Sequence, residues 1–223
     1  MVSYTSEKGF EGSLGGTLEF LRWKSAADME WGWGIFTGLW TLSDSPALTT
    51  LRVVDWFSGT YLSEKTGPFS LRFDLVNQTS SLGDALYQNP PALFNRELFK
   101  LTVSLNLLPG LRLYTGGGCK WPWEDYLNNE SQVLFFSGLE GTSAPFSLLG
   151  SPCRGYLAYH FRYQDQAGGT YDHSFQGGLR LNLDQAPGGS LRLALTYNGG
   201  RSEFGEFFQQ YDQHWGIGIF YDP

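Results

Sequence analysis

Apolar and polar residues alternate with a period of two along much of this chain, and this pattern restricts its possible folds most. Residues 191–196 read Leu-Arg-Leu-Ala-Leu-Thr. Successive side chains of a strand point to opposite faces of a sheet, so such a run forms one apolar and one polar face. The same alternation recurs over 29–39, 69–75, 99–107, 111–114, 157–163, 175–183 and 214–221. No segment has the pattern of a helix of useful length, so the chain is predicted to be all-β.

Three weaker runs, at 14–23, 48–61 and 131–140, complete the predicted set of strands. Asp55 shares a face with Val53 and Phe57, and we expect a β-bulge to restore the pattern there. Residues 131–140 are apolar on both faces and are a candidate for a strand that fills an interior. A further strand is expected within 1–11 or in a long loop. The sequence predicts a single domain over 1–223, an antiparallel up-and-down transmembrane β-barrel of about twelve strands, with ten as the alternative.

Short and long connections alternate between these runs. Compact turns with Pro or Gly occur at 64–67, 109–110 and 184–189. Longer and more polar or acidic connections occupy 77–95, 119–130 and 199–210. Short turns at one end and long external loops at the other are typical of bacterial outer-membrane barrels.

Alternation alone does not say which face meets water, because a soluble barrel places its apolar face inward. The apolar faces stay free of charge over about ten residues, roughly the length of a tilted membrane-spanning strand. Aromatic residues make up 17% of the chain, and many fall near strand ends, as in interfacial girdles. Those expected in girdles are Trp31, Trp40, Trp121, Trp123, Tyr163, Tyr197, Tyr211 and Trp215. No apolar run approaches the length of about eighteen residues that a transmembrane helix needs.

The segment 214–221 resembles the C-terminal assembly signal of bacterial outer-membrane proteins. Its polar, glycine, hydrophobic and aromatic positions fall on His214, Gly216, Ile219 and Tyr221. Asp222 and Pro223 follow the aromatic residue, where many such proteins end. The resemblance implies a location in the bacterial outer membrane, with outer-membrane lipid and the barrel-assembly machinery as partners. Residues 1–4 lack the basic and apolar run of a signal peptide, so we expect a mature or trimmed form.

The polar face of the predicted barrel is rich in basic residues. By parity it carries Arg72, Lys100, Arg112, Arg154, Arg162, Arg180 and Arg192. The acidic residues expected on the same face are Glu30, Asp74, Glu140, Asp172 and Asp212. These charges either pair across strands and fill a narrow bore, or form a basic wall that binds or passes small anionic solutes. The net charge of −7 argues against nucleic acid as a partner.

The residues that could carry catalysis or bind metal form no specific motif. By parity His160 and His214 face inward and His173 faces outward, and no serine lies two residues from a histidine to form a catalytic pair. Cys119 and Cys153 belong to no zinc-binding spacing. They fall at opposite strand ends, which disfavours a disulfide. We therefore expect no catalytic residue, metal or cofactor.

Residues 66–118 resemble a family of bacterial envelope proteins that is known as domain of unknown function 1207. Its motif reads approximately His, any residue, Ser-Ser-His-Leu-Gly-Asp-Glu. The positions that match this motif are Ser80, Leu82, Gly83 and Asp84. Asn77 and Ser81 replace the histidines and Ala85 replaces the glutamate, so a metal or catalytic role of those histidines does not carry over. The resemblance implies an outer-membrane barrel and no particular reaction.

The sequence as a whole predicts an outer-membrane channel or structural barrel with a polar, mildly basic lumen for small anionic solutes. One alternative is an outer-leaflet lipid-modifying enzyme of the deacylase or lipase type that uses His160 or His214 in a cross-strand pairing. The other is a soluble ligand-binding β-barrel.

Overall fold

The computed structural model describes residues 9–25, 28–44, 50–83, 94–120, 133–148, 151–165, 169–182, 190–202, 204–207 and 210–222. Over these residues the prediction of an all-β chain is confirmed. The strands are β1 (Gly9–Lys24), β2 (Glu30–Asp44), β3 (Leu51–Thr66), β4 (Phe69–Leu82), β5 (Phe94–Leu108), β6 (Leu111–Lys120), β7 (Val133–Thr142), β8 (Phe146–Leu148), β9 (Ser151–Gln164), β10 (Thr170–Asn182), β11 (Ser190–Arg201) and β12 (Tyr211–Asp222). A 3₁₀ turn, η3 (Gly205–Phe207), precedes β12. Across the described ranges, no helix has the length and apolar character needed to cross a membrane.

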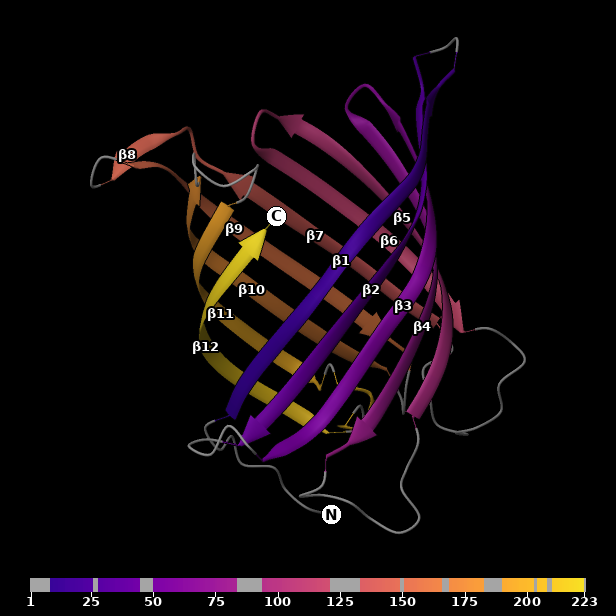
Figure 1. Cartoon of the computed structure of the whole chain (residues 1–223), viewed down its shortest axis with the longest axis vertical. Helices are drawn as coiled ribbons and strands as arrows, with labels where there is room; N and C mark the ends of the chain where they lie inside the picture. The colour runs from indigo at the N-terminus through magenta and orange to yellow at the C-terminus, as the bar shows by residue number, and fades with distance from the viewer. Residues whose placement is uncertain are drawn as a thin grey trace.

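The strands form one antiparallel sheet that curls into an open half-barrel (Figure 1). Each strand pairs with its neighbours in chain order from β1 to β12, except that β8 pairs only with β9. No ladder joins β1 to β12 in the part of the chain that the structure describes, so the expectation of a closed barrel is wrong. The path from β1 to β12 holds eleven strands. This odd number makes β1 and β12 run in the same direction, which prevents the antiparallel seam of an up-and-down barrel.

The predicted number of twelve strands is confirmed. β1, β3 and β7 occupy the three weaker candidate segments. The strand that completes the count is β8, which forms a short hairpin with β9. In the segment 1–11, where the sequence suggests a further strand, residues 9–11 open β1. Residues 1–8 lie outside the described residues.

The two ends of the half-barrel differ in their connections. At one end, which we call the turn end, 67–68 joins β3 to β4 and 109–110 joins β5 to β6. Gly67 and Gly110 have positive φ angles of 56° and 87° there, a region that glycine adopts at little cost. At the other end, the loop end, longer connections follow β4, β6 and β11. The predicted alternation of short and long connections is confirmed at these positions, whereas 84–93, 121–132 and 183–189 lie outside the described residues.

The apolar face of the sheet is its exposed, convex face. The exposed fraction is 38% for Leu71, 48% for Leu193 and 73% for Ile219. On the concave face, by contrast, Asp74 is only 6% exposed. The faces predicted by parity are therefore the faces observed, with ionic side chains inside the curl and apolar ones outside it.

Aromatic rings on the concave face lie over glycines of neighbouring strands. A Cβ atom at Gly116 would lie 2.4 Å from Cζ of Phe136, and one at Gly34 would lie 2.8 Å from the Tyr61 hydroxyl. Phe136 and Tyr61 are both buried. Only glycine at positions 34 and 116 leaves room for the rings of Tyr61 and Phe136. These rings fill part of the space over the concave face. Phe136 fits the expectation that residues 131–140 help to fill an interior.

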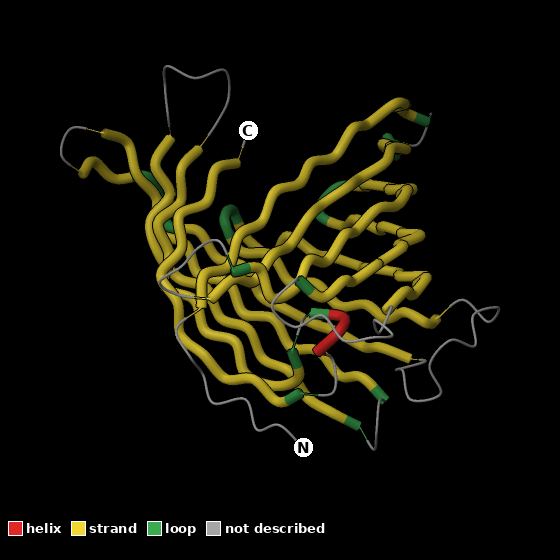
Figure 2. The backbone as a smooth tube through the Cα atoms, turned by 60° about the horizontal axis from the view of Figure 1, so that its bottom comes forward, coloured by secondary structure: helices red, strands yellow, loops and turns green. Residues whose placement is uncertain are grey.

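A small apolar core closes against the sheet at the loop end. Phe204 and Phe207, from the connection between β11 and β12, pack on Val53. Figure 2 shows η3 within the curl of the sheet. A register irregularity does lie near Asp55, because the β2–β3 ladder shifts between Leu51 and Val53. It does not move Asp55 to the other face, since β3 pairs with β4 without interruption from Val53 to Thr66. Asp55 and Val53 both stay on the concave face, where the connection covers them.

Candidate functional site

Several ionic side chains of the concave face form pairs with a neighbour. Arg72 Nε lies 2.7 Å from Asp74 Oδ1, and Arg112 Nη1 lies 3.2 Å from Glu140 Oε2. The Arg72 guanidinium also lies 4.2 Å from the ring centre of Tyr61. The first pair lies within β4, and the second joins β6 to β7, so charges of this face pair both along and across strands.

The other predicted charges on the β1–β5 side also have oppositely charged neighbours. Lys100 stands directly opposite Asp74 in the β4–β5 ladder, and its Nζ lies 5.4 Å from the ring centre of Phe136. Glu30 Oε1 lies 2.6 Å from Lys24 Nζ. Arg72 and Lys100 therefore share Asp74 as their acidic neighbour.

A buried cluster centres on Asp172 near the loop end of β10. Its Oδ2 accepts hydrogen bonds from Arg162 Nε at 2.8 Å and from Gln164 Nε2 at 3.3 Å. Its Oδ1 accepts one from the backbone N–H of Arg201 at 2.6 Å. Both oxygens are thus satisfied, as a buried carboxylate requires.

Three predicted basic residues form a row across neighbouring strands near the turn end. Arg180 on β10 stands directly opposite Arg154 on β9 and directly opposite Arg192 on β11. Like charges in opposite positions of a sheet destabilise it. Among the described residues, neither Arg154 nor Arg180 forms an ion pair with a carboxylate. We call these three residues the arginine row.

The side chains of the arginine row turn in different directions. Arg180 Nε donates a hydrogen bond to Ser190 Oγ at 2.8 Å, toward the turn end. Arg192 Nη1 donates one to Gln176 Oε1 at 3.1 Å, toward the middle of the strands. Arg154 is exposed. This splaying separates the guanidinium groups, as repulsion between them requires.

Two aromatic rings flank the arginine row. The Arg192 guanidinium carbon lies 5.5 Å from the ring centre of Tyr156 and 5.2 Å from that of Phe220. These rings and the polar partners of the row do not stand out in the sequence. Parity alone could have placed Tyr156 and Phe220 on this face, but their proximity to Arg192 depends on strand register.

His214 links the two edge strands at the loop end. Its Nδ1 lies 3.0 Å from Asp212 Oδ2, and its Nε2 lies 3.3 Å from Glu11 Oε1 on β1. Asn198 Nδ2 also lies 3.2 Å from Nε2. Both ring nitrogens are therefore occupied by polar neighbours in this arrangement. The contact with Glu11 brings β12 next to β1 without a backbone ladder.

A small cavity adjoins this contact. Its volume is about 30 Å³, which is room for about one water molecule. Glu11, Trp40, Asp172 and His214 contribute to its lining. It is too small to hold an organic substrate.

The remaining histidines lie on opposite faces, as parity predicts. His160 is on the concave face, where its Nδ1 lies 2.9 Å from the Tyr114 hydroxyl. His173 is exposed, and its Nδ1 lies 2.5 Å from the Tyr159 hydroxyl. Each histidine thus has a phenol as neighbour in the part of the chain described.

A buried carboxylate holds η3 against the sheet. Asp55, which is fully buried, accepts hydrogen bonds from Gln78 Nε2 at 2.6 Å and from the backbone N–H of Gly205 at 2.9 Å. Ser80 Oγ donates a further one. Because Gly205 comes from the connection between β11 and β12, this contact ties one side of the half-barrel to the other. The connection therefore narrows the loop-end mouth of the concave space.

The assembly-signal positions alternate between the two faces. His214 and Gly216 lie on the concave face, opposite Asn198 and Thr196. Ile219 and Tyr221 lie on the convex face and are exposed. This placement gives β12 the same polarity as the strands before it.

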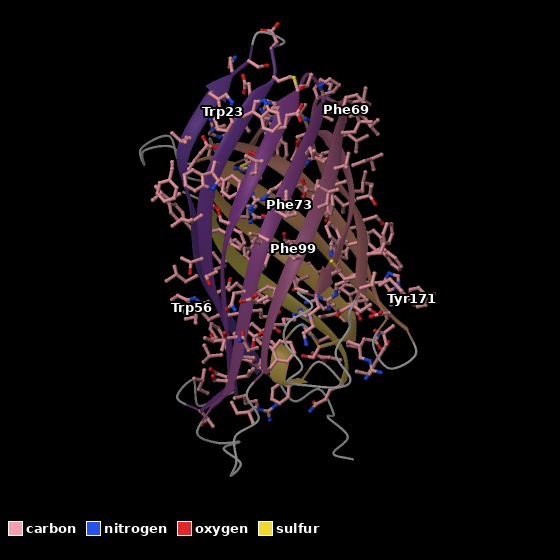
Figure 3. All side chains as sticks on the ribbon, turned by 90° about the vertical axis from the view of Figure 1, so that its right-hand side faces the viewer. Trp23, Trp56, Phe69, Phe73, Phe99 and Tyr171 are labelled. Carbon is pink, nitrogen blue, oxygen red and sulfur yellow. The ribbon has the colours of Figure 1, made fainter. Side chains whose placement is uncertain are left out.

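Aromatic side chains gather at both ends of the convex face. Figure 3 shows Trp23 and Phe69 toward the turn end and Trp56 and Tyr171 toward the loop end. The girdle residues predicted from the sequence are distributed as follows: Trp31, Tyr163, Tyr197, Tyr211 and Trp215 lie on the convex face. Trp40 does not, because its ring packs on Phe57 and Phe204 inside the curl. Trp121 and Trp123 lie outside the described residues.

The cysteines and acidic residues offer no metal centre among the described residues. Cys119 and Cys153 are free thiols, the first exposed and the second buried. No group of three or more His, Cys, Asp or Glu side chains in the described ranges is arranged to hold a metal ion.

The family model for proteins of unknown function 1207 (DUF1207) matches residues 6–222. The chain belongs to this family. Because the match covers nearly the whole chain, the half-barrel and its arginine row fall within the DUF1207 region. No curated protein and no solved structure matches the chain.

Proposed function

We propose that this DUF1207 chain is a bacterial outer-membrane protein whose curled sheet crosses the bilayer and whose polar, basic concave side binds or passes small anions. The observation that carries the proposal is the polarity of the sheet. Leu71, Leu193 and Ile219 are exposed on the convex face, while Asp55, Asp74 and Asp172 are buried on the concave one. A soluble β-barrel has the opposite arrangement.

The extent of the exposed apolar face supports a lipid environment. Exposed Leu, Ile, Phe and Trp side chains occur on nearly every strand of the main path, whereas monomeric soluble proteins rarely expose large contiguous apolar patches. The main strands are 10 to 16 residues long, enough for the roughly 9–11 residues that cross a bilayer. Aromatic rings at both ends of this face fit interfacial girdles.

The open edge requires a further step in this proposal. Hydrocarbon does not tolerate the unpaired backbone groups of a sheet edge, so the edges at β1 and β12 must be covered in the membrane. The contact between Glu11 and His214 holds these two strands together at the loop end. The resemblance of 214–221 to the assembly signal supports delivery by the barrel-assembly machinery.

A pair of adjacent substitutions on β11 tests the membrane assignment. Leu195→Arg places a charge on the convex face, where Leu195 is 46% exposed. Thr196→Arg places it on the concave face. In lipid, Leu195→Arg should destabilise the folded protein by about 2–4 kcal/mol, and Thr196→Arg by much less. The measurement is urea unfolding after reconstitution into vesicles.

The opposite results would contradict the proposal. A protein that purifies without detergent and tolerates Leu195→Arg as well as Thr196→Arg would be a soluble ligand carrier. For a reconstituted protein, conductance across a planar bilayer tests the bore. An anion-preferring current supports passage of solutes, and a sealed bore restricts the protein to binding or to a structural role.

A further inference from the structure

We propose that the arginine row Arg154, Arg180 and Arg192 is a binding site for an oxyanion, with a phosphate group as the best fit. Register places the three side chains in consecutive positions across β9, β10 and β11. Arginine forks match the geometry of phosphate oxygens and bind them through paired, charge-assisted hydrogen bonds. The inference deepens the proposed function, because it depends on the concave face being a solvated interior.

The first argument is electrostatic. Directly opposite positions on adjacent strands bring side chains within about 5 Å, so Arg154 and Arg180 raise the free energy of the folded protein. Among the described residues, neither of them pairs with a carboxylate. An anion bound by both would supply the missing opposite charge.

Another basic residue of the same face, Arg112, differs from the arginine row in its surroundings. Arg112 on β6 already has Glu140 as a partner at 3.2 Å. The row thus differs from its surroundings in lacking an acidic partner at Arg154 and Arg180, not simply in being basic. This difference points to a ligand rather than to general solvation of a charged wall.

The polar and aromatic neighbours of the arginine row orient its side chains. Ser190 holds Arg180 through Nε, and Gln176 accepts a hydrogen bond from Arg192 Nη1. A guanidinium has five N–H donors, so Arg180 keeps donors for a ligand. The rings of Tyr156 and Phe220 beside Arg192 add an apolar border, which suits a phosphate attached to an organic group.

Titration with inorganic phosphate against constant ionic strength tests the site in the folded full chain. We expect saturable binding, weakened about tenfold or more by Arg180→Gln or Arg154→Gln, since each removes charge-assisted hydrogen bonds. The matched control is Arg112→Gln, which removes a basic residue that has its own partner and should change the affinity less than about threefold. Arg180→Lys keeps the charge and should retain much of the binding even if Arg180→Gln folds poorly.

A second titration separates the sources of the phosphate group. Short-chain phosphatidylglycerol that displaces inorganic phosphate and binds more tightly would identify a lipid headgroup as the ligand. Weaker binding of this lipid than of inorganic phosphate would identify a free solute. Equal phosphate affinity in the original chain, Arg180→Gln and Arg112→Gln would overturn the site. Flotation with vesicles reports membrane insertion independently, so a failure of the site and a failure of the membrane assignment can be told apart.

Discussion

β9 and β10 carry two cross-strand pairs on the same concave face, and the two pairs have opposite chemistry. Near the loop end, Arg162 faces Asp172, while near the turn end Arg154 faces Arg180. In the first pair, Arg162 Nε and Asp172 Oδ2 lie 2.8 Å apart, and both carboxylate oxygens accept hydrogen bonds. The second has like charges in the same type of position. The same two strands therefore hold an arginine that is paired with a carboxylate and two arginines that face each other.

The comparison teaches that position along the strand decides the role of an arginine here. At the loop end, Arg162 and Asp172 are covered, and Asp55 holds η3 over the mouth nearby. At the turn end, Arg154 is exposed. Burial demands a partner of opposite charge within the protein, whereas exposure allows the partner to come from solution.

Removal of the carboxylate from the loop-end pair should have the largest effect. Asp172→Ala leaves the buried Arg162 guanidinium and the Arg201 N–H without their acceptor. We expect a loss of about 3–5 kcal/mol in the free energy of unfolding, measured by urea titration. Asp172→Asn keeps an acceptor oxygen and should lose less. Equal tolerance of both substitutions would show that the cluster is not a structural anchor.

A carboxylate introduced into the arginine row should increase the stability of the protein. Arg180→Glu places an acidic group directly between Arg154 and Arg192, so repulsion becomes attraction. We expect a gain of about 0.2–1 kcal/mol in stability and the loss of phosphate-dependent stabilisation. Thermal unfolding in chloride and in phosphate measures both. A destabilised variant that still responds to phosphate would contradict the proposed comparison.

The smallest effect on stability is expected at the exposed ion pair on β6 and β7. Arg112 and Glu140 have side chains that are 44% and 46% exposed, so solvent screens their attraction. Glu140→Gln should cost about 0–1 kcal/mol, and this cost should shrink as salt is added. Denaturation at low and at high ionic strength provides the test. A cost that salt does not reduce would mean that the pair acts through packing.

The alternation in the sequence predicts which residues share a face of the sheet. It does not predict which residues stand opposite one another, because that depends on the register between strands. The faces of Arg154, Arg180 and Arg192 follow from counting by two along each strand. A slip of two residues between neighbouring strands would keep those faces and separate the three arginines. Only the observed ladders place them in one row. The site was therefore visible in the sequence as a set of residues but not as an arrangement.

The errors in the fold have similar causes. Asp55 was expected to need a bulge because its neighbours Val53 and Phe57 are apolar. A distant connection supplies Phe204 as an apolar partner inside the curl, and nothing local in β3 reveals it. Trp40 differs, because parity in β2 already places it on the face opposite Leu39, and its ring packs on Phe204 inside the curl. Long-range contacts of this kind leave no periodic signal.

The odd number of strands on the path from β1 to β12 has a practical outcome for locating this protein in a cell. The chain enters the sheet at one rim and leaves it at the other (Figure 1). If the sheet crosses a bilayer, epitope tags placed before Gly9 and after Asp222 would face different compartments. Antibody labelling of intact cells should then reach one tag and miss the other, which also reveals the orientation.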